Sequence, residues 1–358
     1  DKAPRADINE MIYPITTDYF QNNPKEKVSS GAGHAVYTAR RFPNESWNRN
    51  VFICEPPAHL VASPIITNQG TRFETSGFEQ NLYASADAWS APVSAEVGPD
   101  GAVWIADWYN PICNHNPYRK HQTRGAGNAF VTADRDRTHG RIYRIYPRGS
   151  NEPIYPVLNT DEARIAALDH DNLFWRLTAQ RLLIAHPTAR SEAMLFQLIE
   201  NADSFSRRHA LEVLAGRGDA EIRGVLTSLI DSKDRAMASA ALSHLPRDHV
   251  FRDRVRTILL GKEHHPIVRK QAAIYLAELS PDPLLGETLG QLLLEDETVT
   301  DHLLTAVGIA AIRHPEGFVR YLIEVEANEA VIDPINRYVE KAVQGPLSPG
   351  LRAFARAS

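Results

Sequence analysis

Hydrophobic and polar positions in the second half of the chain repeat every 31 residues. One column of the repeat holds small residues and another, four positions later, holds leucines. The columns are Ala179, Ala210, Ala241 and Ala272, then Leu183, Leu214, Leu245 and Leu276. A third column holds Asn172, Asp203, Asp234, His265 and Asp296. A fixed period of this size is typical of a solenoid, whose repeats bury their apolar faces only against their neighbours.

This register predicts pairs of helices over residues 160–346. The second helix of each pair is expected at 172–186, 203–216, 234–245 and 265–279. An Asn or Asp in the third column can cap the first turn, because its side-chain oxygen accepts from an exposed amide. At His265 the start signal is the following Pro266. The fifth repeat departs from the pattern, with Leu303 and Val307 in the alanine and leucine columns, as terminal repeats often do.

The helical pairs resemble HEAT-like repeats in a short bacterial form. Arginines at Arg176, Arg207 and Arg269 fit the second-helix pattern of that family, and Ala238 departs from it. Tetratricopeptide repeats are a weaker alternative, because their period is about 34 residues and their Trp-Leu-Gly-Tyr pattern is absent.

Residues 30–148 have a different pattern, with short apolar segments divided by turns. Segments rich in β-branched and aromatic residues predict strands at 34–39, 51–55, 59–66, 93–97, 102–108 and 140–146. Short strands at this spacing suggest a propeller, a barrel or a sandwich. The strands suffice for about two propeller blades, whereas a closed propeller needs at least four. We therefore expect residues 1–150 to be the C-terminal part of a propeller-like domain, with residues 1–29 as a lead-in.

Composition limits the class of protein. With 358 residues the chain is long enough for two domains, and residues 347–358 are expected to be a loosely held tail. A net charge of −5 argues against a nucleic-acid binder, which would carry a basic footprint. The chain contains no run of about 18 apolar residues, so we expect no membrane-spanning helix. Cys54 and Cys113 form no metal motif; they are two free buried thiols or, in a secreted protein, one disulfide.

The densest group of polar residues lies between two predicted strands, from Asp107 to His139. Long excursions of this kind are often functional. Asp107, His115, Asp136 and His139 are residue types that ligate metals, although their spacing matches no close-set motif. The alternative is a surface loop tied down by its own ion pairs. Because loops at one end of a propeller meet at its central channel, we expect His115, Arg135, Asp136 and His139 to converge near Asp107.

A second polar group follows the predicted strand 51–55. Glu55 and His59 are residue types that act as acid and base. The alternative is a loop turn with a surface salt bridge. The arginines between positions 135 and 148 form a basic run that acidic residues interrupt, which is typical of a solvated strand edge.

Three blocks of sequence between residues 31 and 148 resemble the final blades of the planctomycete-type membrane-bound dehydrogenases. The first combines FICEP at 52–56 and HLV at 59–61 with SADAW at 85–89 and PV at 92–93, the next is GPDGAVWIADWYN at 98–110, and the last is HGRIYRI at 139–145. These proteins are relatives of the soluble glucose/sorbosone dehydrogenase propellers. Their order is a propeller, then HEAT-like repeats, then often a c-type haem domain. Two departures stand out: the early blades, which supply most catalytic groups, are absent, and no Cys-x-x-Cys-His occurs.

The resemblance implies an α+β, multidomain chain in which a partial β-propeller precedes an α-solenoid. It implies the C-terminal portion of a secreted, periplasmic or extracellular, sugar or alcohol dehydrogenase-like protein. The remaining blades would come from the parent protein or a companion chain, with a carbohydrate and a c-type cytochrome as partners. No cofactor is identifiable in this chain; calcium, quinone or haem would belong to the parent protein. The alternative is a non-catalytic carbohydrate- or protein-binding module.

Overall fold

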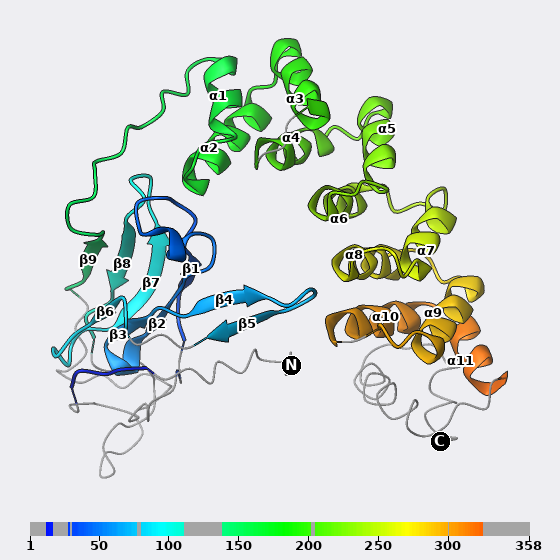
Figure 1. Cartoon of the computed structure of the whole chain (residues 1–358), viewed down its shortest axis with the longest axis horizontal. Helices are drawn as coiled ribbons and strands as arrows, with labels where there is room; N and C mark the ends of the chain where they lie inside the picture. Colours follow the sequence, from blue (N-terminus) through cyan, green and yellow to red (C-terminus); the bar gives the residue numbers. More distant parts are fainter. Residues whose placement is uncertain are drawn as a thin grey trace, which may run out of the picture. The chain divides into compact units, whose positions relative to one another are not determined.

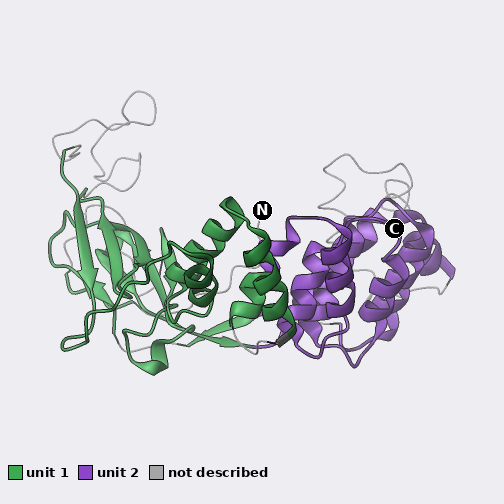
Figure 2. Cartoon of the chain, turned by 90° about the horizontal axis from the view of Figure 1, so that it is seen from above, with its two compact units in different colours: residues 1–68, 73–210 green, residues 69–72, 211–358 purple. Residues whose placement is uncertain are grey.

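The computed structural model describes residues 12–16, 28, 31–76, 80–110, 138–201, 205–299 and 301–324. Antiparallel sheets occupy the N-terminal half and helices the C-terminal half, so the chain is of the α+β class (Figure 1). It divides into two compact units. One contains residues 1–68 and 73–210, and the other residues 69–72 and 211–358 (Figure 2). No helix in the described part of the chain is long and apolar enough to cross a membrane.

The described residues contain nine strands. Their bounds are β1 His34–Val36, β2 Val51–Glu55, β3 Leu60–Ala62, β4 Ile65–Asn68, β5 Phe73–Ser76, β6 Tyr83–Ala84, β7 Pro92–Val97, β8 Val103–Asp107 and β9 Arg141–Ile145. They form a four-stranded sheet in the order β1-β2-β3-β6, the hairpin β4-β5, and a three-stranded sheet in the order β7-β8-β9. Each predicted segment contains a strand, but 59–66 is divided at Pro64, which has no amide hydrogen for a ladder bond.

The core of the β part lies between the two larger sheets. Fully buried side chains from the first sheet, such as Phe52 and Val61, pack with Val103 and Ile105 from β8. In β8 the buried residues alternate with Trp104, which is exposed, as expected for a strand with one face toward a core. Burying each large apolar side chain contributes about 1.5–3 kcal/mol, so this interface stabilises the β part.

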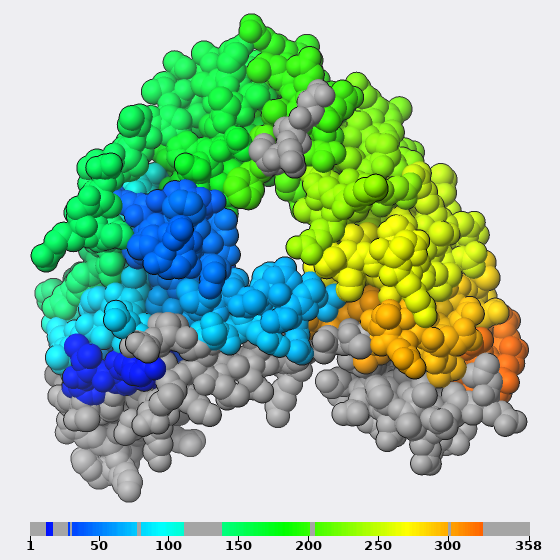
Figure 3. All heavy atoms as spheres, in the orientation of Figure 1, coloured from blue at the N-terminus to red at the C-terminus, as the bar shows by residue number. Residues whose placement is uncertain are grey.

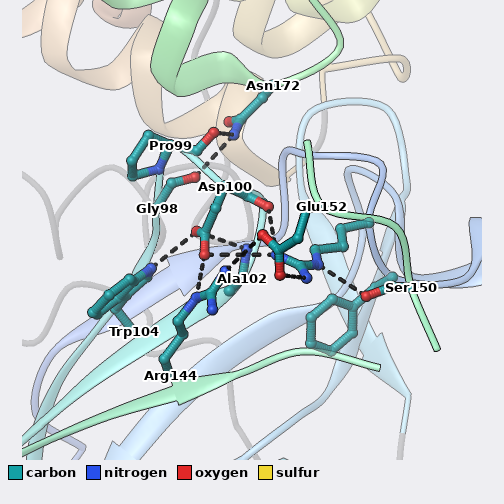
Figure 4. A network of polar contacts seen from close by, with 12 residues as sticks. Gly98, Pro99, Asp100, Ala102, Trp104, Arg144, Ser150, Glu152 and Asn172 are labelled. Atoms are coloured by element: carbon teal, nitrogen blue, oxygen red, sulfur yellow. Dashed lines mark hydrogen bonds and ion pairs between the residues drawn. The ribbon is translucent and has the colours of Figure 1, made fainter. Parts of the chain in front are cut away.

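An acidic side chain fixes the turn between β7 and β8 (Figure 4). Asp100, which is buried, accepts hydrogen bonds from the Ala102 amide at 3.1 Å and the Trp104 indole at 3.0 Å. It also pairs with Arg144 from β9 and, at 3.6 Å, with Arg41. Burial opposes the charge, but the indole N–H and the Arg144 guanidinium outweigh it, so the pKa of Asp100 lies below its usual value.

The same turn is joined to the first helices of the chain. The Asn172 side chain donates to the carbonyls of Gly98 at 2.9 Å and Pro99 at 3.2 Å. The Trp175 indole also donates to Pro99 O, at 2.9 Å. Figure 4 shows Asn172 above the Gly98–Pro99 backbone. A helix cap therefore also ties its helix to the β part.

Eleven helices follow within the described residues. Their bounds are α1 Asp161–Ala167, α2 Leu173–Ala185, α3 Ala189–Asn201, α4 Phe205–Ala215, α5 Ala220–Leu229, α6 Arg235–His244, α7 Arg252–Leu260, α8 Pro266–Ala277, α9 Pro283–Glu295, α10 Asp301–Arg313 and α11 Pro315–Glu324. The expected second helices are α2, α4, α6 and α8. All eight residues of the alanine and leucine columns are buried, each with at most 2% exposure.

Helices two apart in the sequence stack on each other. Helix α6 packs on α8, α8 on α10, and α9 on α11, while α7 contacts α8. In the space-filling view, the yellow and orange segments, which contain α8 and α10, lie directly against each other (Figure 3). The contact of α9 with α11 needs glycine, because a Cβ at Gly317 would lie 1.7 Å from the Pro283 carbonyl oxygen.

The predicted helix caps are largely confirmed. The Asn172 side chain accepts from the Phe174 amide at 3.0 Å, and Asp234 accepts from two amides of α6. His265 does more than expected, because its ring nitrogen accepts from the Ile267 amide at 3.2 Å. Asp203 lies outside the described residues.

The predicted cap at Asp296 is wrong. Asp296 is the C-cap residue of α9, and α10 begins only at Asp301. Its carboxylate instead pairs with Arg269 at 2.5 Å and accepts from the Thr298 amide at 2.9 Å. Arg269 is 1% exposed and also donates to the Leu259 carbonyl at 2.8 Å. A buried guanidinium needs a counter-charge, and this need determines where Asp296 points.

Candidate functional site

Asp107, the last residue of β8, is an anchor for two neighbouring turns. It is 3% exposed, and its carboxylate accepts from the Ser90 hydroxyl at 3.0 Å, the Ala91 amide at 2.7 Å and the Tyr109 amide at 2.8 Å. Tyr109 has a φ of 54°, a left-handed conformation that costs a non-glycine residue about 1–3 kcal/mol. The bond from its amide to Asp107 stabilises this backbone, which sets the direction of the Tyr109 side chain.

Glu55 and His59 flank a short helical turn over Pro56–Ala58 and are both buried. Both side chains are therefore in the interior and not at the surface, where the alternative placed them. The ring Nδ1 of His59 lies 2.5 Å from the carbonyl oxygen of Ser90. His59 and Asp107 thus both contact Ser90.

The grouping of Ser90, His59 and Asp107 does not have the geometry of a hydrolase triad. In a triad the histidine ring accepts the proton of the serine hydroxyl. Here the hydroxyl donates to Asp107, and the ring contacts the Ser90 carbonyl. Tyr83 completes the cluster, with its hydroxyl 3.0 Å from Ser90 Oγ. Burial raises the pKa of Tyr83 to about 12, so this hydroxyl stays neutral and acts as a hydrogen-bonding group.

Of the residues expected to converge near Asp107, His139 is the one that the structure describes. His115, Arg135 and Asp136 lie outside the described residues. The His139 ring meets the Tyr109 ring edge to face, with centroids 6.5 Å apart.

The structure places a solvent-accessible hollow beside this cluster. Its volume is about 410 Å³, and its lining residues are Trp89, Tyr109, His139, Gly140 and Arg141. The rings of Trp89 and Tyr109 are 5.8 Å apart at an angle of 34°, so they form one aromatic wall. The guanidinium carbon of Arg141 lies 3.6 Å from the centroid of the Tyr109 ring. We call this hollow the aromatic pocket.

Asp87 holds two walls of the aromatic pocket in place. One carboxylate oxygen accepts from the Trp89 amide at 3.0 Å, and the other pairs with Arg141 at 3.0 Å. Burial opposes the charge of Asp87, but the Trp89 amide and the Arg141 guanidinium outweigh it, so its pKa lies below the usual value. Asp87 is therefore ionised at neutral pH, and it positions Arg141 by charge as well as by geometry.

Sequence reasoning missed the aromatic pocket. Trp89, Tyr109 and Arg141 come from three separate segments, and each taken alone is an ordinary turn or strand-end residue. The pairing of Asp107 with Arg141 across β8 and β9 brings them together. The sequence did contain one signal: Trp89 lies two positions after Asp87, and Tyr109 lies two positions after Asp107.

Acidic, histidine and cysteine side chains do not cluster in the described part of the chain. Within them, no group of three or more His, Cys, Asp or Glu side chains is placed to hold a metal ion. Asp107 uses its carboxylate for three protein donors. Cys54 is a buried free thiol, and burial raises its pKa to about 12, so it does not provide a thiolate ligand at neutral pH.

A larger hollow of about 660 Å³ lies where α9 meets α11, far along the chain from the polar cluster. Two of its polar side chains, His314 and Asp282, already have structural partners. Both ring nitrogens of His314 are bonded, to the Asp282 amide and the Leu276 carbonyl. Asp282 pairs with Arg252 at 2.7 Å. We therefore take the smaller aromatic pocket as the candidate site.

One family of known proteins matches the β part of the chain. Residues 2–149 match a family described as "Domain of unknown function (DUF7133)". This match spans less than half of the chain, and it contains the aromatic pocket. No curated protein matches the chain.

Proposed function

We propose that the aromatic pocket binds a carbohydrate ring. The observation that carries this proposal is the aromatic wall of Trp89 and Tyr109 with the guanidinium of Arg141 at its edge. A sugar ring has apolar C–H faces and a rim of hydroxyls. An aromatic face suits the former, and the fork of donors on arginine suits the latter. The volume lies near the lower end of the range for small-molecule pockets, as a single sugar ring requires.

In this proposal the buried polar residues support the pocket and do not react. Asp107 and Ser90 fix the strained Tyr109 backbone and the turn that carries Trp89. Precise binding sites need such a supporting layer, because a small displacement of the contact groups weakens recognition. Glu55 and His59 extend the same buried layer toward β2.

We further propose that the two larger sheets are the last blades of a β-propeller. Three observations support this interpretation: each sheet is antiparallel, the sheets follow one another along the chain, and they pack face to face. The remaining blades would come from the parent protein or a companion chain. The helical pairs would form a HEAT-like solenoid, which the buried 31-residue columns support.

The resemblance to glucose/sorbosone dehydrogenases supports a wider role for the parent protein. We propose a periplasmic or extracellular oxidoreductase that acts on a sugar or alcohol, with a c-type cytochrome as electron acceptor. The described residues fit neither calcium nor a covalent haem, so no step is assigned to quinone, calcium or haem here. The second candidate is a non-catalytic carbohydrate-binding module. It is favoured by the position of Asp107, whose oxygens are engaged by protein donors.

Calorimetric titration with neutral pentoses, hexoses and disaccharides tests the binding proposal. We expect Trp89→Ala to weaken sugar binding at least about fivefold, since a lost aromatic contact is worth roughly 1 kcal/mol or more. Trp47→Ala is the matched control, because Trp47 is exposed and lies outside the pocket. Equal binding by the wild type and Trp89→Ala, or no binding by the wild type, would contradict the proposal.

Reduction of an artificial dye separates the two wider roles. The parent protein, with all its domains, is incubated with the sugar that binds. Sugar-dependent dye reduction that Trp89→Ala diminishes supports the dehydrogenase, and binding without reduction supports the binding module.

A further inference from the structure

We infer that the Asp87–Arg141 pair makes the aromatic pocket selective for neutral sugars over sugar acids. This inference rests on the proposed carbohydrate binding and adds the class of sugar. Arg141 lines the pocket, whereas Asp87 is not among the lining residues and pairs with Arg141 at 3.0 Å. Asp87 is therefore a positioning residue, and the ligand contacts Arg141.

Arg141 is held in one orientation by two neighbours. Its guanidinium stacks on Tyr109 at 3.6 Å and is held by Asp87 through one terminal nitrogen. A guanidinium has five N–H donors in a rigid fork, and one of them points to Asp87. The same terminal nitrogen is 3.5 Å from the Tyr143 hydroxyl. The rigid fork fixes the directions of the remaining N–H donors. Their spacing suits two neighbouring hydroxyl oxygens of a sugar.

A free arginine would favour a carboxylate, since the planar fork pairs with two carboxylate oxygens. Here Asp87 already neutralises Arg141. A second carboxylate on the ligand would bring two negative charges to one guanidinium, and like charges at such distances repel. A neutral pair of hydroxyls accepts the same N–H donors without this repulsion.

Asp87→Asn keeps the size of the side chain and an oxygen that can accept from the Trp89 amide. It removes the negative charge next to Arg141. We therefore expect the aromatic wall to persist and the preference of the pocket to shift toward acids.

The experiment compares one hexose with its own uronic acid, glucose with glucuronate, at low ionic strength. Affinities are measured for the wild-type chain and for Asp87→Asn by calorimetry or ligand-detected NMR. The wild type should prefer glucose at least about tenfold. In Asp87→Asn the ratio of affinities should move toward glucuronate by at least about tenfold, as expected for a charge-assisted hydrogen bond. Asp231→Asn, which breaks a surface pair with Arg254, is the matched control and should leave the ratio unchanged.

A second variant separates charge from loosening of the pocket. Arg141→Gln removes the cation, so it should bind glucose more weakly and gain no affinity for glucuronate. Far-UV circular dichroism checks that each variant is folded. Equal wild-type affinity for the two sugars, or an unchanged ratio in folded Asp87→Asn, would overturn this inference and leave carbohydrate binding standing. A wild type that binds neither sugar nor any other neutral sugar would overturn both proposals.

Discussion

Replacing Asp107 by alanine should destabilise the β part strongly. The carboxylate accepts three hydrogen bonds in a buried position. After its removal, the Ser90 hydroxyl can turn to Tyr83, which lies 3.0 Å away. The amides of Ala91 and Tyr109 keep no acceptor. A buried donor left unsatisfied costs about 1–3 kcal/mol, and the Tyr109 amide is only partly buried, so we expect a total loss of about 2–4 kcal/mol.

Asp107→Asn is the informative companion variant. Its side-chain oxygen can still accept from both amides, and its nitrogen can donate to the Ser90 hydroxyl. The expected loss is therefore about 1 kcal/mol, the net worth of one hydrogen bond. Urea unfolding followed by tryptophan fluorescence measures both variants against the wild type.

Two results would refute this reasoning. An unchanged urea midpoint for Asp107→Ala would mean that the three hydrogen bonds do not stabilise the β part. Equal destabilisation by Asn and Ala would mean that the negative charge is what matters, as it would for a bound cation. In that case the interpretation of Asp107 as an anchor would be wrong, and calcium would be tested next.

Three further predictions concern the helices and their junction with the sheets. Ala210→Leu should lower the free energy of unfolding by about 1–3 kcal/mol, because it overpacks a fully buried column; an unchanged urea midpoint would contradict this. Asn172→Ala should cost about 1–2 kcal/mol through the lost cap of α2, and amide hydrogen exchange at the β7–β8 turn should increase if the side chain also holds that turn. Burial lowers the pKa of His314, so its neutral form contributes stability that is present above about pH 6.5 and lost as the pH falls. Thermal melts from pH 7 to 5 should therefore show a flatter decline for His314→Gln, and parallel curves would contradict the prediction.

The helical half could be predicted in detail because its pattern is local. A helix buries one face at a fixed spacing, so the 31-residue columns place α2, α4, α6 and α8. Asp296 is a position at which the local pattern predicts the wrong role. The column continues to Asp296, but the counter-charge that Arg269 needs determines its role. A partner 27 positions away cannot be read from a cap signal.

The candidate site could be predicted only in part for the same physical reason. The sequence pattern predicts that Asp107 ends a strand, and the structure confirms its place at the end of β8. Its function as an acceptor depends on Ser90 and Ala91, which strand pairing brings close. The pocket residues Trp89 and Arg141 have no local pattern that distinguishes them from packing residues. The register between strands determines which residues lie next to Trp89 and Arg141. This register cannot be read from the pattern of residues within one segment.

The most direct test of carbohydrate binding is to observe the five tryptophan side chains during a sugar titration. Indole N–H signals of the labelled protein are recorded by NMR, and the Trp89 signal is assigned from Trp89→Ala. The aromatic pocket predicts that a neutral hexose shifts the Trp89 signal in a saturable manner and leaves those of Trp47 and Trp175 in place. Saturable shifts confined to other tryptophans, or no shift at any sugar concentration, would contradict the account.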